Sequence, residues 1–249
     1  MQETVTLPTA DGPMGVHIVR PDGDGQPLPV VVFFHHGPGL DDPSKDTMRF
    51  IADRGYYVIS HDRYHRDAEW YTMTPEKRKD QAEAQRFFGI LLGTTEEMVT
   101  SDLGAVLEHI DADPAAASDD PLRCIGYCIG ARSVVCTMAW HNDRFGAGVG
   151  LHPSFCTTDQ PDSPHLLVPD ISGAMYVAFG AEDTMQSAAD NAAFIDAINA
   201  MPDGRGEAVV HEGADHGFGV LGSPAYHEGA ASKSYERAFA LFGAPLRDG

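Results

Sequence analysis

A glycine-framed cysteine is the strongest chemical signal in the sequence. Gly126-Tyr127-Cys128-Ile129-Gly130 has the form G-x-nucleophile-x-G, with sulfur where the commoner motif carries serine. A thiolate is a strong nucleophile, and the glycines leave room for the cramped strand-to-helix turn that exposes it. The free N–H groups of a helix that begins at this turn favour the thiolate. The alternative interpretation is a packing turn with a buried cysteine, and the motif alone does not separate the two.

Two further motifs supply the partners that a thiol nucleophile needs. Asp183 ends the motif Phe-Gly-Ala-Glu-Asp after an apolar run, and His216 lies in Gly-Ala-Asp-His-Gly-Phe. Taken singly, the aspartate is often only a turn former and the histidine only a surface residue. Together with Cys128 they follow the chain order nucleophile, acid, histidine, which is the order of α/β-hydrolases. Each follows a predicted strand, where open α/β sheets gather their sites. The sequence therefore predicts a Cys128–His216–Asp183 triad.

Strands and helices alternate along the whole chain. Apolar runs predict strands and helical spacing predicts the helices between them. The predicted strands are 28–34, 56–60, 122–127, 145–151, 174–179 and 208–211, and the predicted helices are 44–54 (with Ser44 as N-cap), 75–92, 95–110, 128–140, 188–200 and 226–242. The alternation predicts a single domain over residues 1–249, of α/β class, with a mostly parallel central sheet flanked by helices on both faces. Segments 4–7 and 14–20 predict an antiparallel hairpin at one edge.

Composition and charge narrow the classes of function. The 249 residues are 43% hydrophobic and carry 17 Lys and Arg against 37 Asp and Glu, a net charge of −20 at pH 7. Nucleic acids and anionic membrane surfaces are bound through basic residues, so we expect neither as a partner. No run of about 18 apolar residues predicts a membrane span, and the first residues lack the apolar stretch of a signal peptide. We expect a cytoplasmic protein, a monomer or a small homo-oligomer.

The cysteines and histidines beyond the three motifs indicate no metal and no disulfide. Cys124 and Cys128 are not spaced as a redox Cys-x-x-Cys pair, and all four cysteines are expected to be reduced. Cys124 and Cys136 are expected in the core, and Cys156 is expected to be exposed near the cleft. His61 and His65, and the pair His35-His36, lack the spacing of a zinc site, which needs three or four converging ligands. We therefore predict no cofactor and interpret these histidines as lining the cleft.

The three motifs together resemble the dienelactone hydrolase (carboxymethylenebutenolidase) family. The similarity in element order covers nearly the whole chain. The resemblance implies an α/β-hydrolase fold, metal-free opening of lactones and esters, and triad roles for Cys128, His216 and Asp183. It also implies an oxyanion hole made by the backbone N–H groups of Gly37 and Ile129.

Two departures from the family pattern bear on the substrate. The family typically has a glutamate that interacts with the resting thiol, and His36 stands in its place here. Members that act on dienelactone hold its carboxylate with arginines, one of them shortly after the catalytic histidine, whereas Gly-Phe-Gly-Val-Leu-Gly follows His216. Arg86 or Arg78 is left to supply the other arginine. With the negative net charge, this favours neutral esters or lactones over carboxylated dienelactone.

The sequence thus predicts a cysteine-dependent hydrolase of small ester or lactone substrates, working by nucleophilic acyl transfer. Candidate substrate-contacting residues are His36, Tyr127, Arg86 and Phe218, together with Trp70 and Tyr71. Residues 64–88 are expected to form part of a cap over the site. Two alternatives stay open. The first is that the same triad acts on phosphate esters or organophosphates, and the second is that the chain is a non-catalytic small-molecule-binding protein on a hydrolase scaffold.

Overall fold

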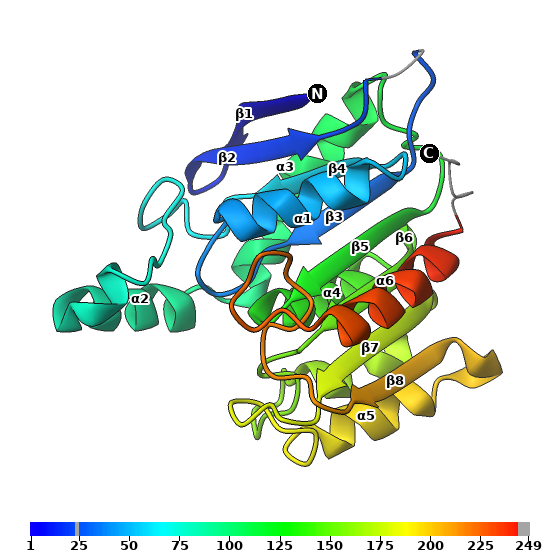
Figure 1. Ribbon diagram of the computed structural model, residues 1–249. Helices are drawn as coiled ribbons and strands as arrows, with labels where there is room; N and C mark the ends of the chain where they lie inside the picture. The colour runs from blue at the N-terminus through cyan, green and yellow to red at the C-terminus, as the bar shows by residue number, and fades with distance from the viewer. Residues whose placement is uncertain (23–24, 244–249) are drawn as a thin grey trace.

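One eight-stranded sheet forms the centre of the computed structural model, which describes residues 1–22 and 25–243 (Figure 1). The strands are β1 (Gln2–Thr9), β2 (Gly12–Val19), β3 (Val30–Phe34), β4 (Tyr57–His61), β5 (Leu122–Tyr127), β6 (Phe145–Leu151), β7 (Ala174–Gly180) and β8 (Gly206–His211). Their spatial order is β1-β2-β4-β3-β5-β6-β7-β8. The pairs β1–β2 and β2–β4 are antiparallel, and the pairs from β4–β3 to β7–β8 are parallel. The predicted parallel sheet with a hairpin at one edge is confirmed.

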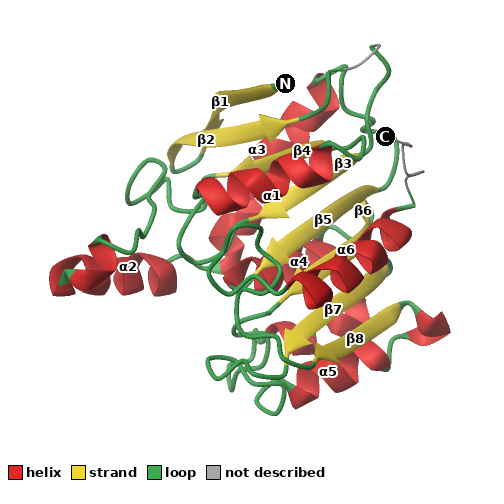
Figure 2. Ribbon diagram, viewed as in Figure 1, coloured by secondary structure: helices red, strands yellow, loops and turns green. Residues whose placement is uncertain are grey.

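Helices cover both faces of the sheet, as predicted (Figure 2). The helices are α1 (Asp42–Ala52), α2 (Gln81–Gly93), α3 (Glu96–Ala112), α4 (Ile129–Trp140), α5 (Ala192–Asn199) and α6 (Glu228–Phe242), with short 3-10 turns η1 (Lys77–Lys79), η2 (Pro164–Leu166), η3 (Val168–Asp170) and η4 (Pro202–Gly204). Helices α1 and α6 lie on one face, and α3, α4 and α5 lie on the other. Helix α2 projects beyond the sheet as a separate arm.

Alternate side chains of the central strands pack into two separate cores. Val30, Val32 and Phe34 of β3 pack on the side of α3 and α4, whereas Val31 and Phe33 pack on the side of α1 and α6. This alternation is the two-residue period of a strand, and burial on both faces is typical of parallel sheets. It explains why β3 is an unbroken apolar run in the sequence.

Capping carboxylates decide where the first two helices begin. Asp41, not the predicted Ser44, caps α1, because its side chain accepts the Ser44 N–H at 3.0 Å. Asp80 caps α2 in the same way and accepts the Ala82 N–H at 2.8 Å. The helix predicted from residue 75 therefore begins only at Gln81, after the η1 turn. Both predicted starts are wrong, because a carboxylate that satisfies the free N–H groups of the first turn sets the boundary.

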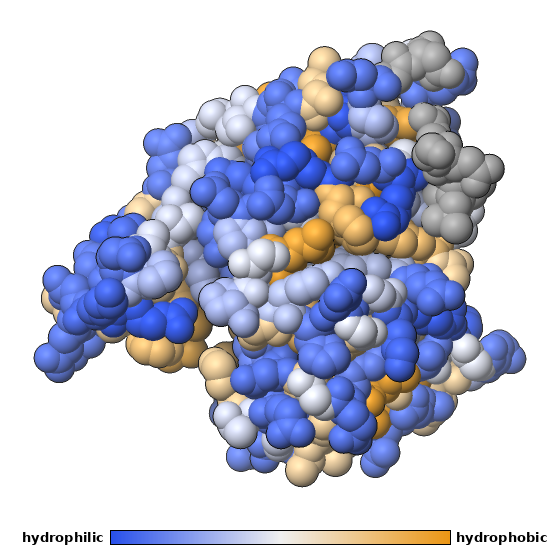
Figure 3. All heavy atoms as spheres, in the orientation of Figure 1, coloured by the Kyte–Doolittle hydropathy of each residue, from blue (hydrophilic) through white to orange (hydrophobic). Residues whose placement is uncertain are grey.

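The α2 arm is anchored by its own apolar cluster. Phe87 and Ile90 of α2 pack against Tyr64, Tyr71 and Met73, apart from the two main cores. The face seen in Figure 3 is mostly hydrophilic, with apolar side chains on the lower side of the arm. In the part of the chain that the structure describes, no helix combines the length and the apolar character needed to cross a membrane.

Candidate active site

The turn between β5 and α4 holds Cys128 in a strained conformation. Its φ of 56° and ψ of −120° lie where residues with side chains rarely sit. Such strain costs about 1–3 kcal/mol and persists only where the surroundings impose it. The Cys128 N–H donates to the Leu151 carbonyl, and the Cys128 carbonyl accepts the N–H groups of Ala131 and Ser154, each at 3.1 Å. These bonds fix the turn and leave the thiol partly accessible.

Glycines on both sides of Cys128 let this turn approach β3 closely. A Cβ atom on Gly126 would lie 2.1 Å from the Gly130 carbonyl oxygen, and a Cβ atom on Gly130 would lie 2.3 Å from the Phe34 carbonyl oxygen. Because the opposing atoms belong to the backbone, no side-chain movement relieves the overlap. The backbone at the start of α4 therefore packs directly against the end of β3 and the loop that follows it.

His216 and Asp183 are hydrogen-bonded at the same edge of the sheet, in the loops that follow β8 and β7. His216 Nδ1 donates to Asp183 Oδ2 at 2.7 Å. The other oxygen of Asp183 accepts the N–H groups of Met185 and Gln186 at 2.9 and 2.8 Å. Burial raises the pKa of Asp183, but these bonds, with that of His216 first, lower it below its usual value and keep the carboxylate ionised. The bond at Nδ1 orients the imidazole of His216, and Nε2 is the ring nitrogen that does not bond Asp183.

The Cys128 thiol and the His216 imidazole shift each other's pKa in opposite directions. Burial raises the pKa of Cys128. The His216 ring, then the Ser154 hydroxyl and the Gly37 N–H, outweigh burial and lower that pKa to about 6. Burial lowers the pKa of His216, but Asp183 and Cys128 outweigh it and raise that pKa above its usual value. Both shifts favour a thiolate beside an imidazolium at neutral pH, although Nε2 makes no regular hydrogen bond to the sulfur.

The loop after β3 is held in place beside Cys128. The Tyr64 hydroxyl donates to the Gly37 carbonyl at 2.8 Å, and the His35 Nδ1 donates to the His36 carbonyl, also at 2.8 Å. The Gly37 N–H lowers the pKa of Cys128 and so favours its thiolate. Ile129 is the first residue of α4, so its N–H has no acceptor within the helix. Of the two residues whose backbone N–H groups the sequence analysis singled out, Gly37 thus lies in the loop after β3, and Ile129 directly follows Cys128.

The sequence analysis missed one residue that touches the Cys128 sulfur. Ser154 Oγ lies 3.4 Å from Cys128 Sγ, and only 3% of Ser154 is exposed. Its position could have indicated it in the sequence, because Ser154 comes shortly after β6, at the edge of the sheet where the other candidate site residues lie.

Comparison with known proteins identifies the family. The model of the dienelactone hydrolase family matches residues 14–246. The chain belongs to the dienelactone hydrolase family. It is therefore an enzyme, a hydrolase that acts on ester or lactone bonds, and its fold is the α/β-hydrolase fold.

Individual relatives cover almost the whole chain. A candidate carboxymethylenebutenolidase of Synechocystis is 26% identical over an aligned length of 257, and the alignment covers 98% of this chain and 96% of the relative. The solved structure of a candidate dienelactone hydrolase from Klebsiella pneumoniae gives a TM-score of 0.80 at 22% identity, covering 98% of this chain and 99% of that one. A dienelactone hydrolase-like promiscuous phosphotriesterase from metagenomic libraries gives a TM-score of 0.72 at 20% identity and 97% coverage of each chain. At these identities the structural likeness shows the fold alone.

His36, which the sequence analysis matches to the family's glutamate, is bound to the first helix. Its Nε2 bonds Asp41 Oδ2 at 3.0 Å, and Asp41 is also the N-cap of α1. Burial raises the pKa of Asp41, but the hydrogen bond and charge of His36 together with the hydrogen bonds from Ser44 outweigh it and lower that pKa to about 2. The histidine therefore fastens the loop that carries Gly37 to the start of α1.

Three predicted cleft residues are buried instead. Tyr127 is fully buried, and its hydroxyl lies 2.8 Å from that of Tyr235 on α6. Phe218 is likewise fully buried in the core on the α6 side. Cys156 has no exposed surface and belongs to the opposite core. Neither Tyr127 nor Phe218 offers surface to a substrate, so any part they play lies behind the residues that contact it. The expectation that Cys156 is exposed is wrong, because the loop after β6 turns its side chain into the core.

Arg86 lies on the α2 arm, where its charge already has partners. Its side chain is 49% exposed, lies 3.8 Å from Glu83 and sits over the Tyr71 ring at 5.3 Å. Arg78 is exposed on η1. The same arm reaches the candidate site through Phe87, which would lie 3.7 Å from a Cβ atom on Gly37. Part of the predicted cap region thus borders the loop beside Cys128. Trp70, another candidate, packs against Gly15 of β2 instead.

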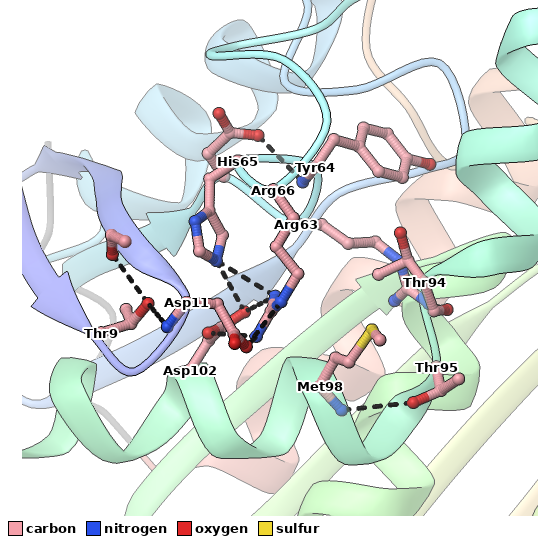
Figure 4. A network of polar contacts seen from close by, with 12 residues as sticks. Thr9, Asp11, Arg63, Tyr64, His65, Arg66, Thr94, Thr95, Met98 and Asp102 are labelled. Atoms are coloured by element: carbon pink, nitrogen blue, oxygen red, sulfur yellow. Dashed lines mark hydrogen bonds and ion pairs between the residues drawn. The ribbon is translucent and has the colours of Figure 1, made fainter.

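The histidines considered for a metal site point in different directions. His61 is buried with its ring 5.8 Å from that of Phe34, whereas His65 Nε2 bonds Asp102 at 3.2 Å. Figure 4 shows His65, Arg66 and Asp102 facing one another beside α3. Among the residues described, no group of three or more His, Cys, Asp or Glu is placed to hold a metal ion. The interpretation of His35, His61 and His65 as cleft-lining is wrong, because their side chains are buried.

Proposed function

We propose that this enzyme hydrolyses small neutral esters or lactones by acyl transfer to Cys128, with His216 and Asp183 completing a catalytic triad. The observation that carries the proposal is the arrangement at one edge of the sheet. The 2.7 Å bond orients His216, and the imidazole lowers the pKa of the neighbouring thiol. A nucleophile, an oriented base and a carboxylate in this relation are what covalent acyl transfer requires.

The first half of the reaction forms a thioester. The Cys128 thiolate attacks the carbonyl carbon, an S–C bond forms, and the carbonyl electron pair moves to oxygen. The N–H groups of Gly37 and Ile129 stabilise this oxyanion. As the intermediate collapses, the C–O bond breaks and His216 Nε2 gives its proton to the leaving alkoxide. In a lactone, the alcohol stays attached to the acyl chain.

The second half restores the thiolate. Neutral His216 takes a proton from water as the water oxygen attacks the thioester carbonyl. The intermediate expels the Cys128 thiolate, the acid is released, and His216 is again protonated beside the sulfur. A thiolate leaves a tetrahedral intermediate more readily than an amine does, so esters and lactones are favoured over peptides. The net charge of −20 and the ion pair of Arg86 with Glu83 favour a neutral substrate.

We predict that an activated acetyl ester leaves an acetyl group on Cys128. An acid quench in the steady state of p-nitrophenyl acetate hydrolysis, followed by mass spectrometry, measures the adduct. Fragmentation must separate Cys128 from Cys124, because both lie on the tryptic peptide 124–132. Acetylation of Cys128 alone supports the proposal. Turnover with the acetyl group on a different residue, or turnover by the Cys128→Ala variant, would contradict it.

A substrate panel tests the phosphate-ester alternative. Neutral lactones, aryl esters, thioesters and phosphotriesters should be compared at equal concentration, with a carboxylated dienelactone as the anionic member. We expect the neutral carbonyl substrates to have the highest kcat/KM. The structural neighbour with phosphotriesterase activity shares the fold at 20% identity, which says nothing about this site. A phosphotriester that outperforms every carbonyl substrate would replace the acyl-transfer proposal.

The pH dependence follows from the direction of the Cys128 shift. The thiolate is lost as pH falls through the lowered pKa of about 6, whereas an ordinary cysteine would already be protonated near pH 8. For an ester without ionisable groups, kcat/KM should rise with pH, reach half of its maximum near pH 6 and stay at its plateau through neutral pH. Initial rates between pH 4.5 and 9 at constant ionic strength measure this. A midpoint above about 8 would show that the thiol is not activated in the resting enzyme.

A further inference from the structure

The segment after β6 places a hydroxyl against the nucleophile. Ser154 Oγ lies 3.4 Å from Cys128 Sγ, within hydrogen-bond range for sulfur. Ser154 is 3% exposed, so bulk water competes little for its hydroxyl. A thiolate has no proton to give, so in the charged state the serine is the donor.

The backbone around Ser154 is built to hold that position. His152 and Phe155 have positive φ values of 41° and 57°, a conformation that residues with side chains adopt only under constraint. The Ser154 N–H donates to the Cys128 carbonyl at 3.1 Å, so the hydroxyl and the nucleophile belong to one hydrogen-bonded unit. The next N–H, that of Phe155, is bound by Gln186 Oε1 at 2.9 Å.

The two other hydrogen-bond donors near the sulfur, His216 and the Gly37 N–H, each have a second role in the proposed reaction. The His216 proton must go to the leaving alkoxide, and the Gly37 N–H must turn to the oxyanion. The Ser154 hydroxyl has neither task. It stabilises the thiolate both as the resting nucleophile and as the group that departs when the thioester is hydrolysed.

We propose that Ser154 is a further catalytic residue, whose hydroxyl donates a hydrogen bond to the Cys128 thiolate and stabilises it as nucleophile and leaving group. This rests on the proposed function for its place in the reaction cycle, but the hydrogen bond itself is testable without turnover. Removal of one charge-assisted hydrogen bond should raise the pKa of Cys128 by about one unit, a roughly tenfold change in the ratio of thiolate to thiol.

The test is the pH dependence of Cys128 alkylation by iodoacetamide, followed by mass spectrometry with Cys128→Ala as the background. In Ser154→Ala the midpoint should move up by about one pH unit. The control is Ser234→Ala, which removes a buried hydroxyl that bonds Tyr176 and His211 instead, and its midpoint should stay at the wild-type value. A wild-type midpoint in Ser154→Ala would overturn the proposal. Alkylation needs no ester cleavage, so failure here and failure of the acyl-transfer proposal are distinguishable.

A second pair of variants keeps the test decisive if Ser154→Ala is too unstable to measure. Ser154→Thr and Ser154→Val have nearly the same shape and differ in one hydroxyl. The threonine variant should have the lower alkylation midpoint, by about one pH unit, and the higher kcat for an ester whose thioester hydrolysis limits turnover. Equal midpoints in the two variants would show that the hydroxyl does not stabilise the thiolate.

Discussion

Replacing Cys128 by alanine should lower kcat/KM for a small activated ester by at least about 10⁴-fold, because the variant lacks the thiol that is proposed to form the acyl intermediate. His216→Ala should cost at least about 10³-fold, because the thiol loses the imidazole that most lowers its pKa. Initial rates with p-nitrophenyl acetate measure both losses. Cys128→Ser is a softer test, since a hydroxyl can take over part of the reaction.

A matched thiol variant separates loss of the nucleophile from loss of structure. Cys136 lies on the same helix, α4, but is 1% exposed in the core. Cys136→Ala should keep kcat/KM within about twofold of wild type while lowering the free energy of unfolding by roughly 1 kcal/mol. Wild-type turnover by Cys128→Ala, or equal losses in the two cysteine variants, would exclude Cys128 as the nucleophile.

Gly126→Ala should destabilise the protein severely, by about 3 kcal/mol or more. The added Cβ would lie 2.1 Å from the Gly130 carbonyl oxygen and 2.8 Å from the Ala131 nitrogen. Both are backbone atoms of the turn that carries Cys128, so relief requires that α4 move away from β5. Such a loss corresponds to a fall in Tm of roughly 6–12 °C for a chain of this size. Any folded fraction should also hydrolyse esters poorly, because the turn that presents the thiol is displaced.

Gly104→Ala is the matched control for this glycine. Gly104 lies within α3, and a Cβ atom there would meet nothing within 4 Å. Alanine is the better helix former by about 1 kcal/mol, so this variant should be as stable as wild type or more stable. Thermal unfolding followed by circular dichroism compares the two. Similar Tm values for both variants would show that the turn at Cys128 tolerates a side chain.

Local patterns were enough to predict the sheet and to single out the three residues proposed for the triad. A strand buried on both faces must be apolar throughout, so 28–34 and 174–179 could be recognised without their partners. Cys128 follows β5 directly, Asp183 and His216 follow β7 and β8 after short loops, and parallel strands end at one edge of the sheet. Their proximity is therefore a consequence of topology, and topology is indicated by the alternation of strands and helices.

Side-chain direction and helix starts were harder to predict, because they depend on partners elsewhere in the chain. Tyr127 precedes the nucleophile directly, yet its side chain enters the core on the α6 side and meets Tyr235. Which face of a strand borders the site depends on the helices packed there, and the sequence near Tyr127 does not contain that information. In the same way, several side chains between Asp41 and Ser44 suit an N-cap, and only the backbone path selects Asp41.

The sequence by itself determined the fold class, the family resemblance and the residues proposed for the triad, because each is written in a short motif or in a repeating pattern. Only the tertiary structure revealed that Ser154 touches the sulfur, that His36 is bound by Asp41, and that Cys156 faces the core. The contact between Ser154 and Cys128 joins residues 26 positions apart and depends on backbone strain at His152 and Phe155. Local propensity disfavours that strain, so only the packed surroundings of the turn can impose it.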